Sequence, residues 1–156
     1  MAGYLHAGDI ISGQEGRATM NVEGSIENMF YIKQLEATME KNKSEVNTLG
    51  HRGTQHKTTG WSGSGSMTIY YITSRFRQMA REYVKNGRDI YFDITIENDD
   101  PTSTVGKQTV VLYGCNVDSV VIAKLDVDNT ELDEDLDFTF EDFEILDSFG
   151  QPQLGG

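Results

Sequence analysis

Acidic residues alternate with large hydrophobic residues near the end of the chain, in the run Asp135-Leu136-Asp137-Phe138-Thr139-Phe140-Glu141. A period of two residues is typical of a β-strand with one buried face and one face in water. The surrounding residues, 125–156, hold eleven of the 25 acidic residues and no Lys or Arg. The pattern therefore predicts a sheet with one strongly negative face.

Length and charge limit the class of protein. With 156 residues the chain can bury one good hydrophobic core but not two. Its formal net charge of -12 argues against a protein that grips nucleic acid or an anionic membrane, since both surfaces would repel it. The N-terminus lacks the basic and apolar regions of a signal peptide, and no apolar stretch approaches the roughly 20 residues of a membrane span. We expect a chain that folds in the cytoplasm without a membrane anchor.

Hydrophobic periodicity predicts a mainly β fold, an antiparallel β sandwich or barrel of about seven strands with one flanking α-helix. The run over residues 29–48 alternates for about twice the usual strand length, and a strand that long often projects beyond its domain. Between Glu141 and Phe143 the alternation slips by one residue, which indicates a bulge or a bend. Strands are expected at residues 17–22, 29–48, 67–72, 89–97, 108–115, 118–127 and 134–145.

The helix is expected over residues 74–86, where apolar side chains recur at helical spacing from Phe76 to Val84. Thr73 or Ser74 would cap its start, and Gly87 would end it. Its other face is rich in Arg and Lys. We interpret that face as solvated surface, with contact to an acidic neighbour in an assembly as the alternative.

We divide the chain into an N-terminal arm over residues 1–14, a single β domain over residues 15–147 and a flexible C-terminal tail over residues 148–156. Within the domain, residues 50–66 are polar and rich in glycine, so a long loop is expected there. Loops of that length usually have a partner or are disordered.

The chain matches no sequence pattern of a catalytic or metal-binding site, so we expect that it is not an enzyme and binds no cofactor or metal. The histidines His6, His51 and His56 lie in expected arms or loops, and no nucleophile motif accompanies them. Cys115 follows an apolar run, which favours a buried, inert thiol over a reactive one. Read as an EF-hand from Asp126, the acidic stretch has Glu131 where a glycine is needed. A looser surface calcium site, in a monomeric calcium- or carbohydrate-binding β module, is the alternative function.

Four segments carry a resemblance to a known family: Thr58–Thr68, Thr73–Arg77, Gly106–Leu112 and Leu125–Asp128. In this order and spacing the chain resembles the XkdM-like tail tube proteins of contractile phage tails, defective prophages and phage-tail-like bacteriocins. The resemblance extends from about Ile11 to Phe143. It implies a β sandwich with a flanking helix, six copies of which form a ring whose inner sheets join into one barrel around a channel. Rings would stack into a hollow tube.

The resemblance also implies partners and a location. A sheath protein, a baseplate or tube initiator and a tape-measure protein would bind the tube, and DNA or ions would pass through it without specific binding. The chain would belong to a virion tail or a bacteriocin particle assembled in the bacterial host cytoplasm. The sequence leaves phage, prophage and bacteriocin origins open.

Two sets of residues are candidates for roles in such a tube. Alternation on the long strand and the acidic strand selects the residues that share one polar face. We assign this face to the channel lining, because a negative wall would repel the phosphates of passing DNA. The same residues could instead face outward to a basic sheath subunit. The lining candidates are Gln34, Glu36, Thr38, Glu40, Asp135, Asp137 and Thr139. The candidates for stacking contacts between rings, with Trp61 as the anchor, are His51, Arg52, His56, Lys57, Trp61 and Ser62.

Overall fold

The computed structural model describes residues 16–29, 31–47, 49–50, 52–99, 106–129 and 131–147. The expected arm, the expected tail and the candidate residue His51 lie outside these residues. The described part contains eight strands and one helix: β1 (Gly16–Val22), β2 (Ser25–Asn28), β3 (Ile32–Val46), β4 (Gln55–Tyr70), α1 (Arg75–Asn86), β5 (Phe92–Asp99), β6 (Lys107–Val117), β7 (Asp133–Phe140) and β8 (Asp142–Asp147).

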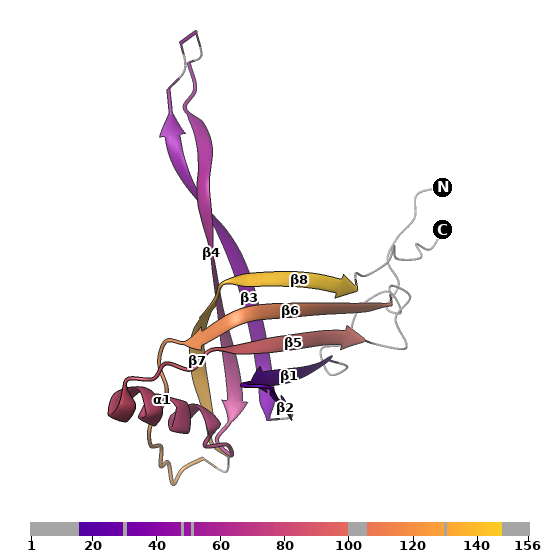
Figure 1. Cartoon of the computed structure of the whole chain (residues 1–156), viewed down its shortest axis with the longest axis vertical. Helices are drawn as coiled ribbons and strands as arrows, with labels where there is room; N and C mark the ends of the chain where they lie inside the picture. The colour runs from indigo at the N-terminus through magenta and orange to yellow at the C-terminus, as the bar shows by residue number, and fades with distance from the viewer. Residues whose placement is uncertain are drawn as a thin grey trace.

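The strands are antiparallel and form two layers that share β6 (Figure 1). One layer has the order β2-β1-β5-β6-β8. The other has the order β7-β4-β3, and it joins the first where Asn116 and Val117 of β6 pair with β7. The two layers cross, as in orthogonal sheet packing. The expectation of a mainly β, antiparallel fold with one helix is confirmed.

The chain turns from one layer to the other at Glu141, between β7 and β8. The slip in alternation at this point is thus confirmed as a bend, fixed by a hydrogen bond of 2.9 Å from the amide of Glu141 to the carbonyl of Tyr113. Gly114 lies beside the bend with a φ of 63°. The positive φ favours glycine here, because a residue with a side chain would be strained; an added Cβ would also lie 2.8 Å from the carboxylate of Glu141, which would have to move aside.

The core lies between the two layers and beneath the helix, with Met20, Met67, Ile94, Leu136 and Phe138 fully buried. Helix α1 adds Phe76, whose ring centroid lies 6.0 Å from that of Phe92. The helix ends as predicted, at Gly87, which adopts the left-handed conformation. Ser74 precedes the helix but makes no side-chain capping bond, and the amide of Arg75 donates instead to the hydroxyl of Thr73 at 3.2 Å. Cys115 is fully buried, as expected.

Two expectations about secondary structure are wrong. Residues 55–66, expected in a loop, belong to β4, because two of the glycines serve packing and not turning. A Cβ at Gly63 or Gly65 would lie 2.4 Å from the ring of Phe140 or Phe138, so the glycines make room for aromatic rings of β7. Residues 118–127, expected as a strand, pair with no strand of the described chain. The backbone of this segment is bound by side chains from elsewhere in the chain: Arg77 donates to the carbonyl of Val121, and the hydroxyl of Tyr71 accepts from the amide of Lys124.

Strands β3 and β4 form a hairpin that projects far from the body of the molecule (Figure 1). β3 is 15 residues long and β4 is 16. Between Glu36 and Glu45 every residue of β3 is exposed, which means that both faces of the outer hairpin lie open. The predicted long strand therefore exists, and it does project.

Candidate assembly surfaces

One face of the β7-β4-β3 layer consists of polar side chains that cross-strand pairing brings together. Gln34 pairs with Thr68, and Thr68 pairs with Asp135 on its other side; Glu36, Ser66 and Asp137 form the next such row. Directly opposed residues in an antiparallel sheet share a face. All the predicted lining residues therefore share it, together with serines that the sequence reading missed. This polar face comprises Gln34, Glu36, Thr38, Glu40, Ser62, Ser64, Ser66, Thr68, Asp135, Asp137 and Thr139.

The polar face is negatively charged, and most of its side chains are short. It holds four carboxylates, on Glu36, Glu40, Asp135 and Asp137, and none of its residues is Lys or Arg. The hydroxyl of Thr68 donates a hydrogen bond of 2.7 Å to Asp135, which orients that carboxylate. Apart from half-buried Thr68, its residues are exposed. The surface is thus rich in hydroxyl groups, and none of the residues that define it carries a positive charge.

A cation marks one end of the polar face. The ammonium of Lys33, at a bulge in β3, donates to Asp133 at 3.0 Å and lies 3.8 Å from Glu131. The hydrogen bond from Lys33 lowers the pKa of Asp133 below its usual value. The acidic side chains farther along the face have no such partner among the described residues, so the negative charge remains open to solvent there.

The hydrophobic side chains on the opposite face of the same layer determine which face is exposed to water. Leu136, Phe138 and Phe140 point into the core from β7, and Met67 does so from β4. A shift of one residue in register would place these side chains in water and the acidic ones in the core. Burial of the hydrophobic set therefore holds the carboxylates on the exposed face.

The stacking candidates occupy the outer hairpin but not one surface. Arg52, His56 and Lys57 are exposed near its end. Trp61 and Ser62 lie on opposite faces of β4, and Ser62 pairs with Glu40 on the polar face. Trp61 packs against its own chain, with ring centroids 6.2 Å from Phe140 and 5.9 Å from Phe143. The role of these residues in ring stacking stays a prediction.

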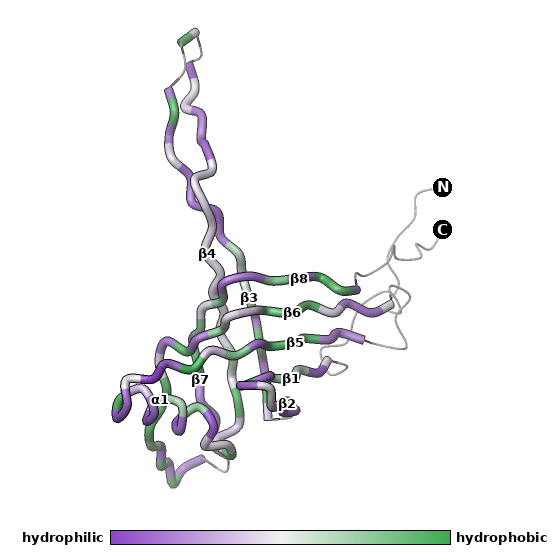
Figure 2. The backbone as a smooth tube through the Cα atoms, viewed as in Figure 1, coloured by the Kyte–Doolittle hydropathy of each residue, from purple (hydrophilic) through white to green (hydrophobic). Residues whose placement is uncertain are grey.

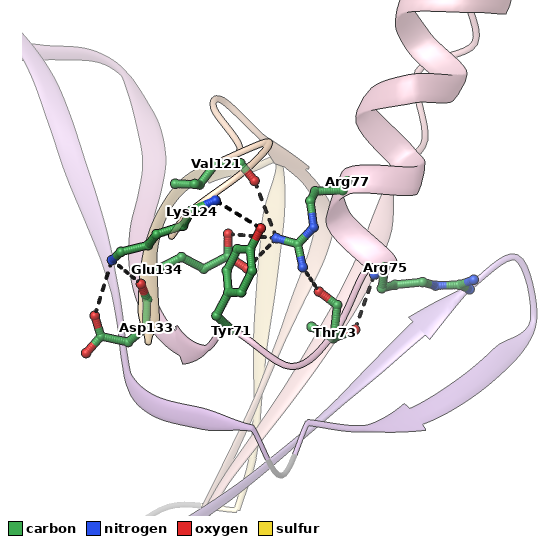
Figure 3. Close-up of polar contacts among 8 residues, drawn as sticks. All are labelled: Tyr71, Thr73, Arg75, Arg77, Val121, Lys124, Asp133 and Glu134. Carbon is green, nitrogen blue, oxygen red and sulfur yellow. Dashed lines mark hydrogen bonds and ion pairs between the residues drawn. The ribbon is translucent and has the colours of Figure 1, made fainter. Parts of the chain in front are cut away.

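A buried ion pair joins helix α1 to β7 (Figure 3). The guanidinium of Arg77 donates to both oxygens of Glu134, at 3.0 and 3.2 Å, and the Glu134 side chain is fully buried. Arg77 also donates to the carbonyl of Thr73 and lies 4.4 Å from the ring centre of Tyr71. The reading of this helix face as solvated surface is therefore wrong at Arg77. Glu134 falls in the same phase of the alternation as Leu136 and Phe138, and that phase was the available signal for a buried acid.

The described residues contain no group of three or more His, Cys, Asp or Glu side chains placed to hold a metal ion. The described residues also contain no helix that is long and apolar enough to cross a membrane.

Solved structures with a similar fold come from tube assemblies. The fold matches a chain in the anti-feeding prophage (AFP) tube terminating cap with a TM-score of 0.69, at 7% identity, over 89% of this chain and 92% of that one. It matches a chain in the sheath-tube complex of an extracellular contractile injection system, PVC, with a TM-score of 0.62, at 10% identity, over 83% and 87% of the two chains. The fold is therefore that of proteins found in tube assemblies.

Sequence comparison is more specific. The family model described as phage tail tube protein matches residues 3–147. The chain is also 48% identical over 141 residues to the phage-like element PBSX protein XkdM of Bacillus subtilis (strain 168), covering 90% of this chain and 93% of that protein. The chain belongs to the phage tail tube protein family. The resemblance stated from the sequence is confirmed.

Proposed function

We propose that this tail tube subunit forms hexameric rings that stack into a hollow tube, with the polar face of β7-β4-β3 as the channel wall. The observation that carries this proposal is the one-signed polar face. A face with four carboxylates and no basic residue is unsuited to holding DNA, because each contact with a phosphate would be repulsive. Six copies would surround a passing polyanion with the same repulsion on every side.

Fixed charges on a channel wall act over a limited range. At physiological ionic strength the Debye length is about 8 Å, so repulsion keeps phosphates from touching the wall without blocking a wider channel. The serine and threonine hydroxyls between the carboxylates keep the wall wet. DNA, or ions in a bacteriocin particle, would slide through without a binding site.

The open edges of the same layer support ring closure. Among the described residues β3 pairs with β4 alone, so beyond Ile32, whose amide donates to the carbonyl of Met29, the N–H and C=O groups on the outer edge of this strand have no strand partner. Long exposed edges promote uncontrolled pairing between chains. Closure of a ring of subunits into one barrel would satisfy these groups and remove the edge.

The proposal extends to the partners of the tube. A sheath protein would surround it, a baseplate or tube initiator would start its assembly, and a tape-measure protein would occupy the channel first. Contraction of the sheath would supply the energy, and this chain would supply stiffness without a catalytic step. The subunit would reside in a virion tail or bacteriocin particle assembled in the bacterial host cytoplasm.

The direction of the polar face can be tested with a cysteine at Thr38, since the native Cys115 is buried and does not compete for reagent. In assembled tubes, a small maleimide should label Thr38→Cys, whereas a maleimide linked to a folded protein should label it only in free subunits. Lys85→Cys on the exposed side of α1 is the matched control and should react with both reagents in tubes. Equal labelling of Thr38→Cys by the bulky reagent in tubes would place the polar face outside, towards a sheath.

A further inference from the structure

One row of apolar side chains in the β2-β1-β5-β6-β8 layer lies at the rim of the core. Cross-strand pairing brings together one residue from each of β1, β5, β6 and β8. We call this set the rim row, and it consists of Ala18, Ile96, Val110 and Ile145. Two residues away along each strand, and therefore on the same face, the neighbouring row lies in the core or packs against it. That neighbouring row consists of Met20, Ile94, Leu112 and Phe143.

The rim row is only partly covered. Ile145 is 55% exposed, and the other three side chains are half-buried. Beside it, Leu146, which a bulge leaves out of the pairing between β6 and β8, is 59% exposed. The β7-β4-β3 layer covers the row incompletely, because it joins β6 at Asn116 and Val117, toward the other end of that strand (Figure 1). Figure 2 shows the hydrophobic segments of β5, β6 and β8 next to one another in this layer. The face thus has apolar surface left for one more segment to cover.

We propose that the N-terminal arm, residues 1–14, packs across the rim row of its own subunit. The arm leads into β1 at Gly16, two residues before Ala18 of the rim row. Gly13 is a turn residue, so the chain can reverse there and return over the face of the sheet. The contact forms in the free subunit, and it goes beyond the proposed tube.

The spacing of apolar residues in the arm matches the width of the rim row. Three strand spacings of about 4.8 Å separate β1 from β8, so the row is roughly 14 Å wide. The arm carries two apolar pairs, Tyr4-Leu5 and Ile10-Ile11. Ile10 lies five residues after Leu5, and five residues of extended chain span roughly 17 Å. With Ile10 over β1, Leu5 therefore reaches Ile145 on β8.

Two other occupants fit the rim row less well. The C-terminal tail also leaves this layer, after Asp147, but the phage tail tube family model matches residues 3–147 and so includes most of the arm and none of the tail. A second copy of the chain needs more surface, because a stable contact between proteins buries about 800 Å² on each partner. A tethered segment needs far less, because its local concentration is on the order of millimolar. Size, reach and family pattern together favour the arm.

Cross-linking tests where the arm lies. When free subunits are treated with a short bismaleimide, Leu5→Cys with Ile145→Cys should form a link within one chain, and Cys115 does not compete because it is buried. The matched control is Leu5→Cys with Ile122→Cys, which pairs the arm with a comparably exposed side chain on the segment between β6 and β7 and should stay unlinked. Denaturing gels separate links within a chain from links between chains, and peptide mass spectrometry locates them. A link between two chains, no link in the first variant, or equal linking in the control would overturn the contact.

Thermal stability tests the same contact without a reagent. In free subunits, Leu5→Ser with Ile10→Ser should lower the unfolding midpoint by about 2–4 °C, because the arm no longer buries apolar surface on the rim row. In an Ile145→Ser background the same arm variant should have less than about half that effect, since its partner is already lost. Phe149→Ser with Leu154→Ser removes two apolar side chains from the tail and should leave the midpoint unchanged.

Both experiments use subunits that sediment as single copies, so their outcome does not depend on whether the chain forms rings or tubes. An arm variant with the same effect in both backgrounds, or with none, would overturn the proposal. A tail variant that behaves as expected for the arm would overturn it too, in favour of the tail as the segment that covers the rim row.

Discussion

At the scale of single residues, the Arg77–Glu134 pair is the most consequential polar contact of the fold. Its carboxylate is fully buried, and the guanidinium supplies both bonds to it. Arg77→Ala should lower the free energy of unfolding by about 3–5 kcal/mol, because it leaves an uncompensated buried charge. Urea unfolding followed by circular dichroism measures this loss. Arg81→Ala, on the exposed side of the same helix, should change it by less than about 0.5 kcal/mol; equal losses would contradict the role given to the pair.

Gly63 illustrates how packing decides a residue type. Gly63→Ala should destabilise the subunit by about 1–3 kcal/mol, because its Cβ would lie 2.4 Å from the Phe140 ring and force the ring to move. At Gly60 the nearest atom to an added Cβ is 4.0 Å away, so Gly60→Ala is the matched control and should be neutral. Urea unfolding of both variants compares them directly, and a neutral Gly63→Ala would show that Phe140 has room to give way.

Burial raises the pKa of the Cys115 thiol from 9.0 to about 12. The folded subunit should therefore resist maleimide at pH 8 and react fully only in denaturant. The raised pKa also makes the stability of the fold depend on pH. Above pH 9 the thiol deprotonates more readily in the unfolded chain, so the free energy of unfolding falls, and below that pH the thiol has no effect. Labelling with and without urea, read by mass spectrometry, checks the first expectation. Rapid labelling without urea would contradict the burial of Cys115.

At the scale of elements, the hairpin is the part least able to stand alone. A two-stranded hairpin without a covering layer is marginally stable in water. Trypsin should therefore cleave free subunits at Lys41, Lys43, Arg52 or Lys57, all of which are exposed. In assembled tubes the same sites should be protected, as shown by mass spectrometry of the fragments. Equal cleavage in subunits and tubes would mean that the hairpin stays uncovered after assembly.

The elements also show what could be predicted from the sequence. Helix α1 and the bend at Glu141 depend on local periodicity, and both were predicted. The residues that β3 and β7 contribute to the polar face were predicted, because alternate residues of a strand lie on the same face of the sheet. Its serines on β4 were missed, because Gly63 and Gly65 resemble turn signals until Phe140 and Phe138 are placed beside them. Residues 118–127 were read as a strand because their backbone partners, Arg77 and Tyr71, are distant in sequence.

At the scale of the whole molecule, charge is arranged along an axis. The body and the polar face are negative, and the projecting hairpin is positive. A monomeric binding module has no evident use for a long hairpin open on both faces. In the proposed stack of rings, the hairpin would gain a cover, the edge of β3 would gain a neighbour and the carboxylates would surround a channel.

The measurement that tests this account most directly is cryo-electron microscopy of the purified chain assembled at high concentration. The account predicts hollow tubes of stacked six-fold rings, with β7-β4-β3 on the channel wall and the Glu36 and Asp137 carboxylates pointing into the channel. Tubes whose channel is lined by β2-β1-β5-β6-β8, or particles that remain single subunits at every concentration, would contradict it.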